Sequence, residues 1–253
     1  MKLLLVICFS VFSLTSFADA QKGLEIMQKA NDVNNGFAGE TSELQMVLIN
    51  AHGDRVERKM DAKITETKGD GDKSIFTFQW PADVKGTKML TWTHKSGDDD
   101  QWLYLPALKR VKRINSSNKT GSFMGSEFSY EDLNSQEVEK YSYNFVKDET
   151  INGRKVSVVE RKSKDKNSGY SKEVVYMDLE YQNPLKIEYF DRKGELLKVA
   201  EFSDYKKFGN FWRANKIHME NKQTKKSSTL VWTNRQLNQS FADSDFNQNK
   251  LKL

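Results

Sequence analysis

The amino-acid sequence predicts a mainly β protein, in which one strongly curved or rolled antiparallel sheet follows a single helix. Two observations lead to this fold class. Large apolar residues alternate with other residues at a period of two, in short runs from residue 44 to residue 232, as in half-buried strands. Turn-forming segments such as residues 52–54, 68–72 and 192–194 separate these runs. With 3 prolines and no Gly/Ser-rich run, the chain shows no linker between domains.

Residues 1–20 have the pattern of a cleavable export signal. A lysine precedes an apolar run at residues 3–17, and small residues lead to a cleavage point near Ala20-Gln21. The run is shorter than the roughly 20 residues of a membrane-spanning helix. Cys8 lies inside the run and is not placed for lipid attachment. We therefore expect a signal peptide, one mature domain at residues 21–253, and a location in a bacterial periplasm.

Residues 22–34 are expected to form the helix, and about ten strands are expected after it. Leu24, Met27 and Ala30 recur at three-residue spacing, and Asn34-Asn35-Gly36 ends the pattern. The alternating apolar side chains that mark the strands are Leu44, Met46 and Leu48; Phe76, Phe78 and Trp80; Trp102 and Tyr104; Val156 and Val158; Val174 and Tyr176; Leu185, Ile187 and Tyr189; Leu197 and Val199; Ile217 and Met219; and Leu230 and Trp232.

The segment from residue 115 to residue 140 interrupts this series of strands. It is rich in Ser and Asn at first, and then carries the apolar residues Phe128, Tyr130 and Leu133 near its middle. We expect a long excursion with a short helix instead of a strand. A loop of this length with apolar residues of its own is often a lid or a binding element.

Charge and motifs argue against several classes of function. The net charge of +5 comes from 40 basic and 35 acidic residues, which is typical of a solvated surface of mixed sign and not of a nucleic-acid binder. His52, His94 and His218 have no partner at metal-ligand spacing. No nucleophile is paired with a base, and no phosphate or dinucleotide fingerprint is present. We expect no enzyme activity, no metal and no cofactor.

Three segments stand out, at residues 78–90, 101–114 and 121–133. The first carries Pro, Asp and Gly-Thr after an aromatic strand, the second reads Trp-Leu-Tyr-Leu-Pro-Ala-Leu, and the third contains Ser-Phe-Met-Gly-Ser. Together they resemble the LolA-like family of outer-membrane lipoprotein-sorting proteins, in particular the branch associated with RND-type exporters. The resemblance implies an incomplete, half-open β-barrel, covered by an N-terminal helix and a helical lid loop, whose concave apolar face holds acyl chains. The lipoprotein carrier itself has a buried arginine in its cavity, to which no residue of this sequence can be matched.

The candidates for the lipid-binding cavity and its lid come from these segments. They are Phe78, Trp80, Met89, Leu90, Trp102, Tyr104, Phe123, Met124 and Phe128. Aromatic side chains on alternate positions could equally fill a closed core. In the third segment, Met124 adapts to irregular apolar partners, and Gly121 and Gly125 would let the backbone of a lid bend.

A basic run follows the second segment and has two interpretations. Lys109, Arg110, Lys112 and Arg113 would alternate on an edge strand, where charge also deters pairing with another sheet. The run could instead contact an acidic protein partner or anionic lipid headgroups.

Three functions remain open from the sequence. The leading one is a monomeric periplasmic carrier that takes a lipid or a lipidated protein toward the outer membrane, with transient membrane contact and an RND-type inner-membrane transporter as partner. The second is an adaptor or regulator of such a transporter that binds no lipid. The third is a hydrolase of envelope lipid or glycan, for which no residue is nominated.

Overall fold

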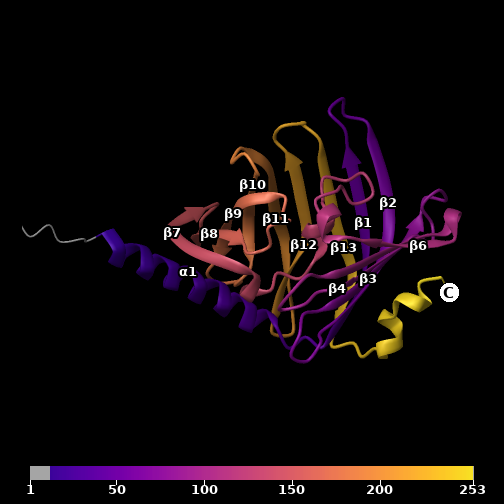
Figure 1. The fold of residues 1–253 in the computed structure, drawn as a ribbon, viewed down its shortest axis with the longest axis horizontal. Helices are drawn as coiled ribbons and strands as arrows, with labels where there is room; N and C mark the ends of the chain where they lie inside the picture. Colours follow the sequence, from indigo (N-terminus) through magenta and orange to yellow (C-terminus); the bar gives the residue numbers. More distant parts are fainter. Residues whose placement is uncertain (1–11, 253) are drawn as a thin grey trace, which may run out of the picture.

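A computed structural model describes residues 12–252 of the chain (Figure 1). One α-helix, α1 (Phe12–Asn34), precedes all the strands. The strands are β1 (Gly39–Ile49), β2 (Arg55–Thr65), β3 (Lys73–Trp80), β4 (Lys88–Trp92), β5 (Asp100–Leu105), β6 (Arg110–Ile114), β7 (Tyr141–Ile151), β8 (Arg154–Ser163), β9 (Tyr170–Asp178), β10 (Pro184–Asp191), β11 (Leu196–Phe208), β12 (Phe211–Asn221) and β13 (Ser227–Leu237).

All the strands belong to one antiparallel sheet with 13 members. Their order is β6-β5-β4-β3-β2-β1-β13-β12-β11-β10-β9-β8-β7, so β6 and β7 are its two edges and the sheet does not close. The ladder between β1 and β13 joins the first and the last strand at the centre of the sheet. It runs from Glu40 opposite Leu237 to Ile49 opposite Ser227. Figure 1 shows how strongly the sheet curves. The predicted mainly β fold, an open and curved antiparallel sheet after one helix, is confirmed.

The sheet has more strands than the sequence pattern indicated. Strands β2 and β7 carried no clear alternation, because their exposed positions hold long runs of charged and polar residues. In β2 only Met60 and Ala62 are buried. A strand that buries so few side chains leaves a weak apolar signal, although its backbone pairs on both sides.

Helix α1 begins before the predicted residue 22, because nothing in the preceding segment breaks a helix. Gly23 lies where the helix packs closely against the sheet. A Cβ atom there would lie 2.9 Å from the backbone nitrogen of Phe145 in β7, so only glycine lets the two backbones approach (Figure 1). Met27 and Ala30, further along α1, are buried in the core. Residues 1–11 of the predicted signal peptide, including Cys8, lie outside the described residues.

Residues 115–140, here called the excursion, link the two edge strands. They contain the short 3₁₀ helices η2 (Ser116–Asn118), η3 (Tyr130–Leu133) and η4 (Val138–Lys140), and an isolated bridge between Ser122 and Ser129. The prediction of a long excursion with a short helix is therefore confirmed. Among the described residues, no helix is long and apolar enough to cross a membrane.

The sheet buries apolar side chains on two faces. We call the face packed against α1 and the excursion the inner face, which carries the larger core cluster, including Phe78, Met89 and Phe123. The outer face carries a smaller cluster in which Leu90 and Trp102 contact the C-terminal segment. That segment contains the 3₁₀ helices η5 (Asp243–Phe246) and η6 (Gln248–Lys250).

Candidate binding cavity

The excursion folds into a compact turn on the inner face. The ring of Phe123 lies 5.8 Å from the ring of Phe78 on β3 and 5.9 Å from that of Tyr130, measured between centroids. The amide of Phe123 donates to the carbonyl of Phe128 at 2.7 Å, and the Ser126 hydroxyl donates to the carbonyl of Phe123 at 2.7 Å. The sequence thus directs two aromatic side chains from one polar turn into the sheet.

Two apolar hollows flank this turn. The larger, about 300 Å³, lies between α1, the excursion and strands β8 to β12. The smaller, about 140 Å³, lies between the excursion and strands β1 to β3, β12 and β13. Phe128, Asp132 and Ile217 line both, so these three side chains separate one hollow from the other. The larger hollow is at the lower end of the volume range of ligand pockets.

A buried ion pair fixes the excursion to the sheet between the hollows. Asp132 of η3 pairs with Lys198 of β11, and each side chain is only 4% exposed. The hydroxyl of Tyr170 and the amide of Ser129 also donate to Asp132, at 2.7 and 2.6 Å. Lys198 donates in addition to the carbonyl of Glu127 at 3.0 Å. Because both charges have several partners, their desolvation is compensated and the excursion is held in one position.

A second buried ion pair forms part of the wall of the larger hollow. Arg161 of β8 lies opposite Glu173 of β9 in the strand register, and its Nε donates to Glu173 at 2.9 Å. Both side chains are about 5% exposed, and the guanidinium lies 4.6 Å from the ring centroid of Tyr141. The neighbouring carboxylate holds the pKa of Arg161 above its usual value, despite burial. The larger hollow therefore has two charged but neutralised groups, Arg161 and Asp132, on an otherwise mostly apolar wall.

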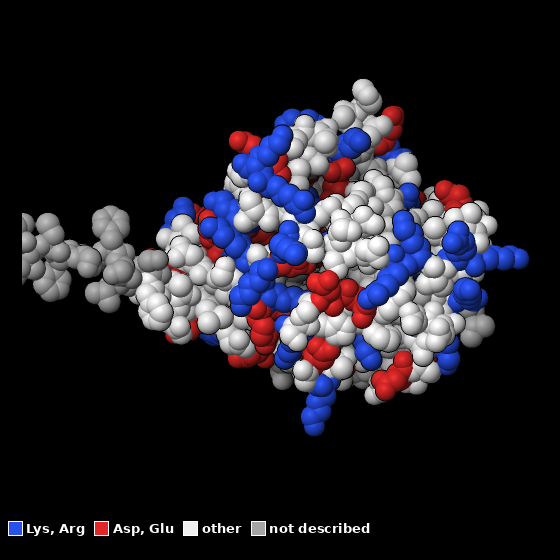
Figure 2. All heavy atoms as spheres, in the orientation of Figure 1, with Lys and Arg blue, Asp and Glu red and all other residues white. Residues whose placement is uncertain are grey.

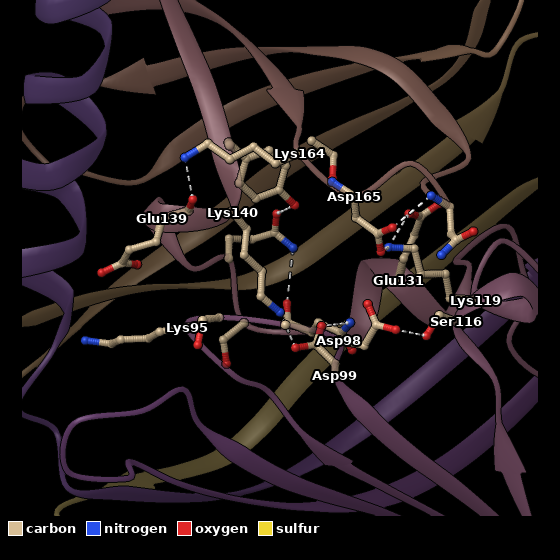
Figure 3. Close-up of a pocket in the computed structure, with 18 of the residues that line it drawn as sticks. Lys95, Asp98, Asp99, Ser116, Lys119, Glu131, Glu139, Lys140, Lys164 and Asp165 are labelled. Atoms are coloured by element: carbon tan, nitrogen blue, oxygen red, sulfur yellow. Dashed lines mark hydrogen bonds and ion pairs between the residues drawn. The ribbon is translucent and has the colours of Figure 1, made fainter.

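A polar pocket of about 610 Å³ lies between the two edges of the sheet (Figure 3). Its ion pairs join different segments: Lys140 pairs with Asp99, and Lys119 pairs with Asp165. Gln136 lines both this pocket and the larger hollow, so the polar and apolar compartments are neighbours. The excursion is thus tied to the β4–β5 loop through Asp99 and to the β8–β9 loop through Asp165.

Comparisons with known proteins show to which family this chain belongs. A model of a family described as "uncharacterized protein" matches residues 70–253. The crystal structure of a Vibrio parahaemolyticus domain, assigned as an outer membrane lipoprotein-sorting protein, is 48% identical and superposes with a TM-score of 0.91, covering 92% of this chain and 100% of that one. This chain belongs to the outer membrane lipoprotein-sorting protein family.

Two further structures have the fold of this lipoprotein-sorting family. A DUF1329 family protein from Desulfovibrio piger is 28% identical, with a TM-score of 0.88 over 92% of this chain and 99% of that one. A LolA superfamily protein from Nitrosomonas europaea is 18% identical, with a TM-score of 0.71 over 91% and 98%. The last similarity shows the fold alone, and it matches the half-open barrel that the sequence motifs implied. No protein in the search of curated sequences matches this chain significantly.

In this member of the lipoprotein-sorting family, two acidic side chains have strongly raised pKa values. Burial raises the pKa of Glu131 to about 7, although Gly169 and Ser168 donate to its carboxylate at 2.9 and 3.0 Å. Burial, together with the nearby carboxylates of Glu137 and Glu66, raises the pKa of Asp72 to about 7. Glu131 ties the excursion to the β8–β9 loop through these two hydrogen bonds, so a change in its protonation changes the charge of the group that accepts them.

The raised pKa of Glu131 predicts a pH-dependent stability. The folded protein holds this proton up to about pH 7, whereas the unfolded chain releases it near pH 4.5. The free energy of unfolding is therefore expected to fall by about 3 kcal/mol as pH rises through this window of about 2.5 pKa units, at about 1.4 kcal/mol per unit. Asp72 acts in the same direction.

Denaturant unfolding at a series of pH values measures this dependence. Glu131→Gln should remove roughly half of the slope between pH 4.5 and pH 7, and Asp72 should account for the remainder. Glu139→Gln is the matched control, because Glu139 is exposed at the rim of the same polar pocket. An unchanged slope in Glu131→Gln would contradict the assignment.

The structure brings five of the nine predicted cavity residues together on the inner face. Phe78 and Met89 are fully buried beneath the excursion, while Phe123, Phe128 and Met124 belong to the excursion itself. Of these five, Phe123 and Phe128 line the hollows. Their role in lipid binding stays a prediction.

The other four predicted cavity residues lie elsewhere. Leu90, Trp102 and Tyr104 are on the outer face with Phe246 and other residues of the C-terminal segment. The physical reason is the pleat of a strand: Met89 and Leu90 are consecutive, so they must point to opposite faces. Trp80, at the end of β3, is 50% exposed.

The basic run lies at the surface, as the sequence suggested, but only partly on a strand. Lys109 follows the 3₁₀ turn η1 (Pro106–Leu108) in a left-handed conformation, with φ at 49°, and β6 begins one residue later. Arg113 pairs with Asp100 across the sheet. Arg110 and Lys112 are exposed and form no ion pair within the described residues.

The side chains that line most of the larger hollow were not singled out as candidates. They are Met27, Val175, Met177, Ile187, Tyr189, Ala200 and Met219, with Arg161 beside them. Ile187, Tyr189 and Met219 had marked strands by their alternation, but nothing in the sequence distinguished a strand that faces a hollow from one that faces a filled core.

Proposed function

We propose that this protein is a periplasmic carrier that binds the acyl chain of a lipid or lipidated protein on the inner face of its sheet. The observation that supports this most directly is the larger hollow, whose wall is mainly apolar and which is covered by α1 and the excursion. At about 0.8 kcal/mol per methylene, burying about ten methylenes would contribute about 8 kcal/mol before the costs of association. Such binding requires no catalytic group, and we infer that the protein is not an enzyme.

Membership of the lipoprotein-sorting family supports a carrier of this kind. The name of the Vibrio parahaemolyticus relative refers to sorting of outer membrane lipoproteins. For this chain we propose transport from an RND-type inner-membrane transporter toward the outer membrane. Export fits the position of Gly23: cleavage near Ala20-Gln21 would leave the close contact with β7, and the buried Met27 and Ala30, in place.

The experiment is recovery of the protein from the periplasm, followed by organic-solvent extraction and mass spectrometry of both protein and extract. We expect a protein mass corresponding to residues 21–253 and close to one acyl-containing molecule per chain. No lipid in the extract, together with no binding of a fluorescent fatty acid, would contradict the carrier function.

A variant that fills the larger hollow tests the location of the bound chain. Ala200 is fully buried and lines this hollow, so Ala200→Leu would occupy space that a ligand needs. Losing room for about three methylenes should weaken fatty-acid binding by roughly 50-fold. Ala51→Leu adds the same volume at the exposed β1–β2 turn and should bind as the parent protein does. Equal affinity of both variants would place the ligand elsewhere.

One observation favours the adaptor as a second candidate. On the β3–β4 side of the inner face, Phe78, Met89 and Phe123 fill the space with side chains of the protein itself. If the whole inner face were closed in this way, the protein would contact a transporter without carrying lipid. Crosslinking to an inner-membrane transporter in cells, from a protein whose extract contains no lipid, would favour this function.

A further inference from the structure

Two hairpins turn at the same end of the sheet and form what we call the basic tip, residues 79–88 and 105–113. The β3–β4 and β5–β6 connections meet there, since a Cβ atom on Gly86 would lie 3.3 Å from the ring of Pro106. Lys59 of β2 belongs to the same surface, because it lies opposite Trp80 in the strand register. In Figure 1 this end of the molecule is at the right, beyond the label of β6.

The basic tip exposes two large apolar side chains. Trp80 is 50% exposed at the end of β3, and Leu108 is 63% exposed on the turn between β5 and β6. Earlier apolar residues of the same two strands, Phe78 of β3 and Leu103 of β5, are buried in the core. An indole held at a surface is typical of residues that sit at a membrane interface, where one part of the ring is apolar and another is wet.

Cations surround these two side chains. Lys59, Lys85, Lys109, Arg110 and Lys112 are all exposed, and none forms an ion pair within the described part of the chain. Asp83 is the one acidic residue in the basic tip. Figure 2 shows Lys and Arg side chains gathered at this end of the molecule. The charge of the basic tip is therefore strongly one-sided, although the protein as a whole is nearly balanced.

We propose that the basic tip docks the protein on the surface of a bilayer that contains anionic phospholipids. Trp80 and Leu108 would enter the interfacial region, and the surrounding cations would contact the phosphates. Lysine suits this partner, since each lysine near an anionic surface contributes independently, whereas lysine is depleted from protein–protein interfaces. A narrow end built from two turns also offers little area for a stable protein interface.

Docking in this orientation would place the excursion near the bilayer. Arg58, next to Lys59 on β2, donates a hydrogen bond to the carbonyl of Met124. The turn of the excursion beside the smaller hollow is thus attached to β2, the strand that contributes Lys59 to the surface of the basic tip. The docking proposal goes beyond the carrier function and does not depend on it, because docking can be measured with protein from which any lipid has been removed.

Flotation with protein-free vesicles tests the proposal. Delipidated protein should bind vesicles of phosphatidylethanolamine and phosphatidylglycerol at low salt, bind much less at high salt, and not bind pure phosphatidylcholine. On binding, tryptophan emission should shift to shorter wavelength, and Trp80→Phe should reduce this shift. Failure of the full-length mature protein to bind anionic vesicles at low salt would overturn the proposal.

Paired lysine variants locate the contact. Lys109→Ala/Lys112→Ala should weaken vesicle binding by about 25-fold, or about fivefold per cation. Lys206→Ala/Lys207→Ala removes two exposed lysines before the β11–β12 turn and should bind as the parent protein does. Equal losses in the two double variants would mean that binding is not confined to the basic tip. Binding to cell membranes that is absent with protein-free vesicles would assign the basic tip to an acidic protein and overturn the lipid assignment.

Discussion

Lys198→Met is expected to lower the free energy of unfolding by about 3–5 kcal/mol, one of the largest effects that a single substitution should have here. The reason is the burial of its partner. Asp132 is 4% exposed, and without Lys198 its carboxylate would keep only the hydrogen bonds from Tyr170 and Ser129. Removal of one member of a buried pair leaves an uncompensated charge. Urea unfolding followed by tryptophan fluorescence measures the change.

The double variant Lys198→Met/Asp132→Leu is the matched control. With both charges removed, most of the lost stability should return, since an apolar pair of similar volume often replaces a buried ion pair without cost. The excursion would still be attached through Glu131 and through Arg58, which donates to the carbonyl of Met124. If Lys198→Met unfolds at the urea concentration of the parent protein, the ion pair does not hold the excursion.

Phe128→Ala is expected to have two separate effects. It removes a buried ring that is 4% exposed, at a cost of about 3–5 kcal/mol in stability. It also removes part of the boundary between the two hollows, because Phe128 lines both. If the protein carries acyl chains, the variant should accept longer chains than the parent protein, and a bound chain should recover part of the lost stability.

Phe246→Ala is the control for this prediction. Phe246 is 1% exposed, but it belongs to the cluster on the outer face. This variant should lose a similar amount of stability and leave the lengths of the bound acyl chains unchanged. The chain lengths are measured by mass spectrometry of the extracts, and stability by thermal unfolding with and without fatty acid. An identical chain-length distribution from Phe128→Ala and the parent protein would show that the hollows do not hold the chain.

The fold class could be predicted from the sequence because successive side chains of a strand point to opposite faces of the sheet. Strands such as β10 and β12 are buried on one face, and a period of two in Ile187 and Tyr189 or in Ile217 and Met219 follows directly. The excursion was also recognisable, because Ser- and Asn-rich residues replace that period. The charged strand β7 was not recognisable, because it shows no apolar alternation. It is held in place by pairing with β8 and by α1, which packs against it.

The candidate cavity could be predicted only in part. Phe123 and Phe128 were found because their motif is distinctive, but the side of the sheet that each strand residue faces depends on register. Leu90 and Met89 illustrate this: both are apolar and adjacent, and only the strand pairing shows that Met89 faces the excursion. The pair of Asp132 and Lys198 joins residues 66 positions apart. A contact of that kind leaves no pattern in a local stretch of sequence.

The order of the strands has a consequence for how the chain can fold. Each neighbouring pair in the sheet consists of consecutive strands, with the single exception of β1 and β13. Hairpins between consecutive strands close short loops, which costs little chain entropy, whereas the ladder of β1 and β13 closes a loop of nearly the whole domain. The two halves of the sheet can therefore form from local contacts, and their central ladder is the slow, long-range step. A circular permutant that joined the ends of β13 and β1 and opened the excursion would convert the sheet into one uninterrupted meander.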